Sequence, residues 1–305
     1  AFAPYTGVKT AIVFLTKLKE PVRSDYNVFF AVSRSAGKDS SGRQTGETDY
    51  ERIVRSFSHF LHGEGFKWAK KSTVYDGYDS SFEVVSSREV IDTGRLDAEH
   101  YDPTTRRLQR RISEISHTTI SSHVECKIPR LRRSVTRGEI AYVDISSVDQ
   151  RTGLTFPECI PVETAPSRAS YPVSRGDVLV STVRPDRNVV AMITDGQAAP
   201  AVASNGFCVL RAKDIAPELL FAYCKTKAFR EMLSLKATAS MYPTVNDRDV
   251  LDVPFLRPPA EVEDEVVRRI RDGLEMIRRA QSEIAAAVEL MNHAVSSAVE
   301  EEGVV

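Results

Sequence analysis

The chain has 305 residues, of which 42% are hydrophobic and 27% charged, as in a soluble globular protein of one or two domains. Its 41 Lys and Arg against 42 Asp and Glu give a formal net charge of -1, which excludes a uniformly basic, histone-like protein but permits a local basic face. No apolar run approaches the ~18 residues of a membrane helix, so we expect no membrane partner. The four scattered cysteines form no CxxC pair, which predicts a reduced, cytoplasmic protein.

The N-terminal part, residues 1–65, predicts a strand–strand–helix unit. Residues 11–15 (AIVFL) and 27–32 (NVFFAV) are rich in β-branched and aromatic residues, which favours buried strands. The Gly- and Ser-rich residues 33–48 predict a surface loop, and Asp49 then caps a helix through YERIVRSFSHFLHGE. This unit is too small to bury much apolar surface alone. Because the sequence opens on it without an initiator Met, we expect a chain cut from a longer one.

The middle of the chain predicts a connector over residues 66–94 and then one mixed α/β domain over residues 95–257. Leu108, Ile112 and Ile115 have the spacing of a short helix. Residues 217–237 (PELLFAYCKTKAFREMLSLKA) predict one or two further helices. Between these helices lie β-rich runs punctuated by Gly, Pro, Asp or Asn, at residues 138–149, 171–185, 188–194 and 205–212.

Residues 258–302 predict a single long helix that follows Pro258-Pro259. Apolar residues recur at alternating spacings of three and four, which is a heptad repeat with one polar position. A helix of ~40 residues is ~60 Å long, and its narrow apolar seam favours a coiled coil in a dimer or with another subunit. The alternative is a helix lying on its own domain. The seam residues expected in dimerisation are Val267, Ile270, Leu274, Ile277, Gln281, Ile284, Val288 and Met291.

No group of residues makes a convincing catalytic or metal site, so we predict no catalytic residue and no metal in this chain. Residues 37–42 (GKDSSG) have the glycine spacing of a phosphate loop, but Arg-Gln follows where Lys-Ser/Thr is needed. His59 and His62 are three apart without further ligands beside them. Glu125-Cys126-Lys127, with Asp102 upstream, has only part of the pattern of a metal-dependent nuclease.

Clusters of basic residues are more informative, because phosphate contacts supply much of the affinity of proteins for nucleic acids. On cluster counts alone, solvated surface charge is the favoured alternative. The clusters are Arg106, Arg107, Arg110 and Arg111; Arg130, Arg132, Arg133 and Arg137; Lys67, Lys70 and Lys71; and the pair Arg184 and Arg187.

Several sequence blocks together resemble one half of a specificity subunit of type I restriction–modification systems, that is, one target recognition domain and one spacer helix. In order these blocks are RLDAEHYDP, AYVDISSVD, APSRASYPVSRGDVLVSTVRPDRN, SNGFCVLR and ATASMYPTVNDRDVLDVPFLRPP, followed by the long helix. The resemblance covers about residues 95–300. The sequence departs from the family after the double proline, where AEVEDEV stands in place of a Glu-Gln-containing helix start.

The segments FAPYTGVKTAIVFLTK, NVFFAVSRSAGKDSSG and DYERIVRSF, within residues 2–62, resemble the C-terminal end of the catalytic domain of adenine-N6 DNA methyltransferases. Neither the Asn/Asp-Pro-Pro-aromatic motif nor the glycine-rich strand end for S-adenosylmethionine occurs in the sequence. The resemblance therefore implies a methyltransferase tail (1–65) before the recognition domain. It also implies that S-adenosylmethionine belongs to an associated catalytic domain and that this chain alone is not an enzyme.

These resemblances imply a module that reads one half-site of double-stranded DNA and assembles through the heptad helix, as a homodimer or with a second recognition unit. Two such units would prefer an interrupted palindrome, and the methylated base would be an adenine flipped out of the duplex. The alternatives are a coiled-coil scaffold without DNA binding and an enzyme with an unrecognised hydrolytic site. The expected DNA contacts are Arg168, Arg184, Arg187 and Asn205, with Arg130, Arg132 and Arg133 on phosphates.

Overall fold

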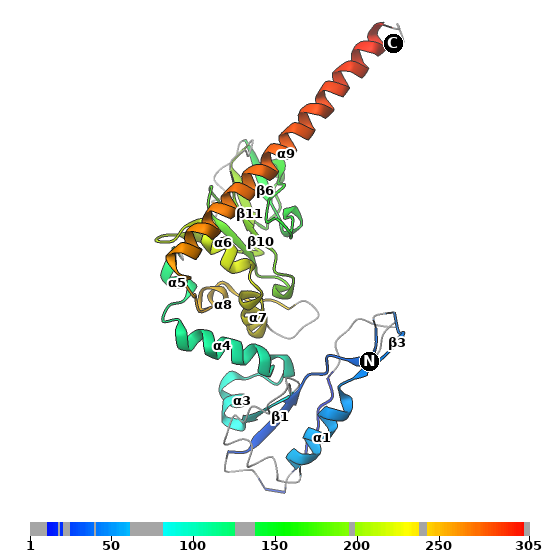
Figure 1. The fold of residues 1–305 in the computed structure, drawn as a ribbon, viewed down its shortest axis with the longest axis vertical. Coiled ribbons are helices and arrows are strands. Elements are labelled where there is room, and N and C mark those ends of the chain that lie inside the picture. The colour runs from blue at the N-terminus through cyan, green and yellow to red at the C-terminus, as the bar shows by residue number, and fades with distance from the viewer. Residues whose placement is uncertain are drawn as a thin grey trace. The chain divides into compact units, whose positions relative to one another are not determined.

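The computed structural model describes residues 11–17, 19–20, 25–39, 41–61, 82–125, 138–194, 199–237 and 243–301 (Figure 1). Contacts divide the chain into two compact units. Unit 1 comprises residues 1–117 and 231–245, and unit 2 comprises residues 118–230 and 246–305. The predicted class, a mixture of helices and strands with a long C-terminal helix, is confirmed. The chain passes between the units after His117, after Arg230 and after Val245.

Unit 1 is built around a two-stranded antiparallel sheet of β1 and β4. Phe30 of β1 and Val85 of β4 are buried together with Tyr101, whose ring stacks on Phe30 at a centroid distance of 4.1 Å. The elements are β1 (Asn27–Ala31), β2 (Ala36–Lys38), β3 (Gln44–Thr48), α1 (Tyr50–Leu61), β4 (Phe82–Ser86), α3 (Ser87–Thr93), η1 (Ala98–Tyr101) and α4 (Pro103–Ile115).

Three expectations for unit 1 are corrected. Residues 11–17 form no strand, and Leu15 is 89% exposed, so an apolar run alone did not identify a buried element. The expected loop 33–48 contains the β2–β3 hairpin, because the Asp39 carboxylate closes its turn by accepting from the backbone N–H groups of Ser41 and Arg43. The expected connector contains β4 and α3, and β4 supplies the partner strand of β1.

Unit 2 contains two four-stranded sheets, in the orders β10-β9-β12-β5 and β7-β6-β11-β8. Within the second sheet, β6 and β11 are parallel neighbours. The strands are β5 (Val124–Glu125), β6 (Glu139–Val143), β7 (Glu158–Pro161), β8 (Ala169–Pro172), β9 (Val178–Ser181), β10 (Val190–Met192), β11 (Ala201–Ser204) and β12 (Phe207–Ala212). The short 3-10 turns are η2 (Ile145–Ser147), η3 (Val162–Thr164) and η4 (Pro185–Arg187).

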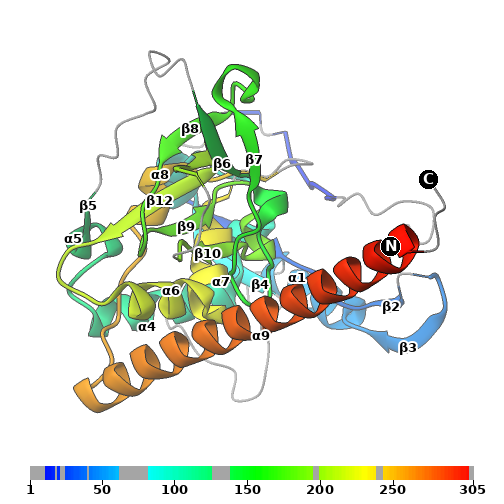
Figure 2. The ribbon, with the colours of Figure 1, turned by 90° about the horizontal axis from the view of Figure 1, so that it is seen from above.

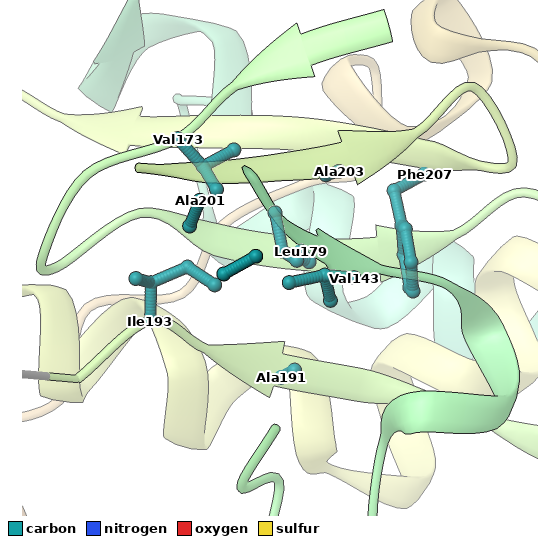
Figure 3. Close-up of a cluster of buried hydrophobic side chains, with 9 residues drawn as sticks. Val143, Val173, Leu179, Ala191, Ile193, Ala201, Ala203 and Phe207 are labelled. Atoms are coloured by element: carbon teal, nitrogen blue, oxygen red, sulfur yellow. The ribbon is translucent and has the colours of Figure 1, made fainter. Parts of the chain in front are cut away.

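The main core of unit 2 takes side chains from both sheets (Figure 3). Val143 of β6 and Ala203 of β11 cluster with Leu179 of β9 and Phe207 of β12. On β9, Val178 and Val180 are also buried, and helix α6 (Pro217–Lys225) packs against β9 and β10. A strand buried on both faces reads as a continuous apolar run, which is why VLVS was recognisable in the sequence.

The remaining helices complete the fold, and one of them, α7 (Lys227–Lys236), spans the boundary between the two units after Arg230. The expected helical segment 217–237 is two helices, α6 and α7, separated at Thr226, whose hydroxyl donates to the carbonyl of Tyr223 and accepts from the backbone N–H of Phe229. The short helices α5 (Ile120–His123) and α8 (Asp247–Leu251) were not foreseen. The long helix is confirmed as α9 (Ala260–Glu301), 42 residues, and its first half runs along α6 (Figure 2).

Candidate nucleic-acid interface

The parallel pairing of β6 and β11 brings the loops that follow them to one end of unit 2. Val143 and Ala203 are register partners near the carboxyl ends of the two strands. Since parallel strands end at the same edge of a sheet, Asp144 and Asn205 leave the sheet as neighbours. The antiparallel strand β8 begins at this edge, with Ala169 opposite Ser204.

Backbone hydrogen bonds join the loops carrying the predicted DNA contacts. The N–H of Asn205 donates to the carbonyl of Arg168 at 2.8 Å. The backbone N–H and the hydroxyl of Thr182 both donate to the carbonyl of Gly206, at 2.9 and 3.0 Å. Thr182 in turn leads directly into the turn that holds Arg184 and Arg187. Residues 144–152, 166–168, 182–188 and 205–206 therefore form one surface, which we call the recognition edge.

Arg168 and Asn205 are exposed on this edge. The Arg168 side chain is 61% exposed, and its Nη2 lies 3.2 Å from Oδ2 of Asp144. Such a pair on the surface is held by little free energy, so the guanidinium can leave Asp144 for an acceptor on a ligand. Asn205 occupies the tight turn between β11 and β12, where the residue is exposed.

Arg184 and Arg187 occupy the turn between β9 and β10, which contains η4. Arg184 has φ 50° and ψ 63°, and Asn188 at the other end of the turn has φ 50° and ψ 50°. Both residues are therefore left-handed, a conformation costing roughly 1–2 kcal/mol for most residues other than glycine. Arg187 lies between them and is exposed, whereas Arg184 is half-buried. The turn thus carries backbone strain at a surface position, a combination frequent at functional sites.

The recognition edge carries more positive than negative charge. Its segments contain four arginines, including Arg151, against three aspartates, and Lys225 of α6 adds a fifth cation. Burial lowers the pKa of Lys225 although Asp149 works in the opposite direction. Hydrogen bonds from the Arg151 N–H and the Thr152 hydroxyl lower the pKa of Asp149, which is therefore ionised at neutral pH. A local excess of cations is what an anionic polymer such as DNA requires.

Sequence analysis missed three contributors to this surface. Gln150 donates through its side chain to the carbonyl of Arg187, and Lys225 donates to the carbonyl of Gln150. Asp144 holds Arg168. The turn sequence DQRTG around Gln150 was a signal that could have placed this loop, whereas nothing local to Lys225 indicates its partner, which lies 75 positions away.

The predicted phosphate contacts Arg130, Arg132 and Arg133 lie outside the described residues. The last family block, ATASMYPTVNDRDVLDVPFLRPP, contains Ser240, Tyr242 and Asn246, and the first two of these also lie outside the described residues. Asn246 has a structural role, because its side chain accepts from the N–H of Asp249 at 3.0 Å and the Asp249 carboxylate accepts from the N–H of Asn246, a capping box at the start of α8.

The arginines of α4, in unit 1, divide into structural and exposed members. Arg106 is ion-paired with Glu89 and lies over the Tyr101 ring at 5.3 Å. Burial raises the pKa of nearby Glu83, against the opposing effect of Arg106 and Arg110. Arg107 and Arg111 face solvent and remain available to an anionic partner.

The apolar seam of helix α9 is half-buried in the first part of the helix and exposed in the second. Val267, Ile270, Leu274 and Ile277 are half-buried in unit 2, where Arg271 also binds Glu218 of α6 at 3.0 Å. In its second half, the helix projects past the rest of unit 2 (Figure 1). There the exposed fractions of Ile284, Val288 and Met291 are 67%, 53% and 64%. We call Gln281, Ile284, Val288, Met291 and Val295 the exposed seam.

The weak enzymatic motifs serve structural purposes where they are described. Gly37 and Gly42 belong to the β2–β3 hairpin, with φ of 72° and 84°. The Asp102 carboxylate accepts from the N–H groups of Thr104 and Thr105, capping α4, and pairs with Arg34. His62, Cys126 and Lys127 lie outside the described residues. Over the described ranges there is no cluster of three metal-ligand side chains and no helix suited to crossing a bilayer.

No family model matches the sequence, and no curated protein matches it. Among solved structures, the chain is similar to the HsdS subunit from Thermoanaerobacter tengcongensis, with 30% identity and a TM-score of 0.44 over 55% of this chain and 44% of that chain. It is also similar, with 28% identity and a TM-score of 0.46, to a chain from a structure described as the basis of complex assembly and conformational transition of the type I R-M system. The match again covers 55% of this chain and 44% of the other.

The chain thus spans less than half the length of each of these two structures.

Proposed function

We propose that this chain is the DNA-recognition module of a type I-like restriction–modification adenine methyltransferase, and that unit 2 reads one half-site of double-stranded DNA. The observation that carries the proposal is the gathering of Arg168, Arg184, Arg187 and Asn205 on one edge of two packed sheets. Readout in the major groove uses Arg with guanine and Asn or Gln with adenine, held on a rigid scaffold. The edge offers both types of side chain.

Arg130, Arg132 and Arg133 complete the proposed interface as phosphate contacts. A truncated phosphate arginine should weaken binding to all sequences alike, whereas a truncated base-reading arginine should relax one position. The two kinds of arginine are therefore separable by experiment, although they lie in one chain.

The exposed seam supports a second part of the proposal, assembly with another helix. A helix that presents Ile284, Val288 and Met291 at heptad spacing gains by burying them against a partner. Val267, Ile270, Leu274 and Ile277 are already half-buried in unit 2, so the expected dimerisation surface shortens to the second half of α9. A homodimer, or pairing with a second recognition unit, would place two half-sites at a fixed separation.

The methylation chemistry is assigned to a different domain or subunit. The sequence lacks the motif that holds the adenine amine and the glycine-rich strand end for S-adenosylmethionine. We give the cofactor no residue in this chain, which is proposed to be non-catalytic on its own. Residues 1–65, with their resemblance to a methyltransferase tail, are proposed to connect with the catalytic domain, and the whole assembly is expected in the cytoplasm.

The proposal is tested by selection from a randomised DNA duplex library with the full chain, at low and at high salt. One enriched sequence is expected, with affinity that falls as salt rises. The absence of enrichment at low salt would refute the DNA-reading proposal. Sedimentation in parallel separates it from the alternative favoured by the exposed seam, a coiled-coil scaffold that self-associates without binding DNA.

A further inference from the structure

Two hydrogen bonds join the turn 184–188 to residues outside it, and a third joins those two outside residues to each other. The side-chain amide of Asn188 donates to the carbonyl of Lys225, at the C-terminal end of α6, over 3.1 Å. The side-chain amide of Gln150 donates to the carbonyl of Arg187. The Lys225 ammonium donates to the carbonyl of Gln150 over 2.5 Å. The three bonds link the turn, the helix end and the 149–152 turn in a closed ring.

The backbone strain of the turn explains why hydrogen bonds from outside it are needed. Arg184 and Asn188 both lie in the left-handed region, which strains the backbone at Arg184, whereas Asn is among the residues that tolerate it. Within the turn itself there are two backbone hydrogen bonds. The N–H of Arg187 donates to the carbonyl of Arg184, and the N–H of Asn188 donates to the carbonyl of Pro185. The outside bonds at Arg187 and Asn188 fix the second half of the turn to the body of unit 2.

The Lys225 side chain is partly removed from water, which costs its ammonium group some free energy of hydration. Its side chain is half-buried, and its ammonium lies 5.9 Å from the centre of the Phe221 ring. Burial lowers the pKa of this lysine, as expected when a cation leaves water. An ammonium used only for surface charge would remain fully solvated, so its position indicates a bonding role toward Gln150.

We infer that Gln150, Asn188 and Lys225 are positioning residues for DNA sequence discrimination, because they hold the turn in the one conformation that presents Arg187. This inference rests on the proposed function. A guanidinium must be fixed in plane and position to bind a guanine edge through two bonds, whereas attraction to phosphates tolerates a mobile arginine. Loss of the ring should therefore reduce discrimination between sequences and leave general DNA affinity almost unchanged.

Two variants open the ring at different bonds without altering charge. Asn188→Gly accepts the left-handed backbone but loses the amide donor to Lys225. Gln150→Ala loses the amide donor to Arg187 and keeps the backbone carbonyl that Lys225 binds. Ser41→Ala, in the hairpin turn of unit 1, is the matched control, because it also removes one side-chain hydrogen bond from an exposed turn. Circular dichroism and Tm verify that each variant is folded.

The experiment measures, for the full chain, the affinity for the selected duplex, the affinity for a scrambled duplex, and amide hydrogen exchange of residues 182–190 without DNA. Both ring variants should lose about tenfold in the ratio of the two affinities, keep the scrambled affinity and its salt dependence, and exchange faster in this segment. Ser41→Ala should match the wild type in all three. Lys225→Met, which also removes a cation, should reduce the ratio and additionally lower the scrambled affinity.

The outcomes distinguish failure of the proposed function from failure of the positioning role. A wild-type chain without any sequence preference overturns both the proposed function and the positioning role. A wild-type preference that Asn188→Gly and Gln150→Ala retain in full overturns the positioning role alone. Equal losses of selected and scrambled affinity would also overturn it, since the ring would then serve folding or general binding rather than discrimination.

Discussion

Gly153 packs so closely against helix α6 that any side chain there should destabilise unit 2. Its φ is +75°, and its N–H closes the 149–153 turn by donating to the carbonyl of Asp149 at 2.7 Å. A Cβ added at this position would lie 2.4 Å from Cε2 of Phe221 and 3.0 Å from the carbonyl oxygen of Val190. Phe221 is only 3% exposed, so its ring has no free space to enter.

The magnitude for Gly153→Ala follows from two contributions. Holding alanine in the left-handed region costs about 1 kcal/mol, and forcing a methyl group into a filled core costs about 1–3 kcal/mol. The free energy of unfolding should therefore fall by about 2–4 kcal/mol. Urea unfolding of the full chain, followed by circular dichroism, measures this change from the shift in midpoint at constant slope.

Gly176→Ala is the matched control within the same unit. Gly176 has φ +88°, but its added Cβ would meet only the ring of Pro217, at 3.3 Å. It should therefore show the backbone cost of about 1 kcal/mol with little packing cost. The reasoning is refuted if Gly153→Ala destabilises no more than Gly176→Ala, because the close approach to Phe221 would then have no energetic consequence.

Three further predictions concern DNA, assembly and pH. Arg187→Ala should cost about 1–3 kcal/mol at the selected duplex and relax one base position, as measured by competition binding; an unchanged sequence preference would contradict it. Val288→Asp should weaken self-association at least about tenfold, whereas Ser282→Asp, off the seam, should leave it unchanged in sedimentation equilibrium. Burial of Asp49 works to raise its pKa, but hydrogen bonds from the Ser33 hydroxyl and from the backbone N–H groups of Arg34, Ser35 and Asp49 lower the pKa below the usual 3.8. Its stabilising effect should thus be present above pH 3.8 and lost as the pH falls through the lowered pKa, so the stability gap between wild type and Asp49→Asn should narrow on acidification. A gap independent of pH would argue against an ionised Asp49.

Much of the fold was predictable wherever a periodic pattern had enough length. The heptads fixed α9 almost to its ends, and the apolar runs located β1, β6, β9 and β12. The weak strand β11 (AVAS) was missed, because short runs of small residues carry little signal. Residues 11–15 were wrongly assigned to a strand, since an apolar run does not specify a pairing partner.

The candidate site was predictable in its residues more than in its arrangement. The arginines and Asn205 came from turn-like sequences, but their adjacency depends on the parallel pairing of β6 with β11, residues about 60 positions apart. The Asn188–Lys225 and Lys225–Gln150 bonds also join distant segments. Local sequence therefore offered candidate side chains for DNA binding, whereas long-range contacts decided which of them lie together.

The seam of α9 is a second feature for which the sequence did not show which residues are covered. The heptad pattern continues unchanged from Val267 to Val295, and it predicts one continuous surface for a partner. The first half of that surface is half-buried in unit 2, where Arg271 pairs with Glu218. Periodicity reveals an apolar face but not what covers it, so the sequence alone could not separate these two halves.

Amide hydrogen exchange of the full chain, with and without the DNA duplex obtained by selection, tests the central claim most directly. The account predicts that DNA slows exchange at residues 144–152, 166–168, 182–188 and 205–206 together. Slowed exchange confined to other parts of the chain, with these four segments unchanged, would contradict it.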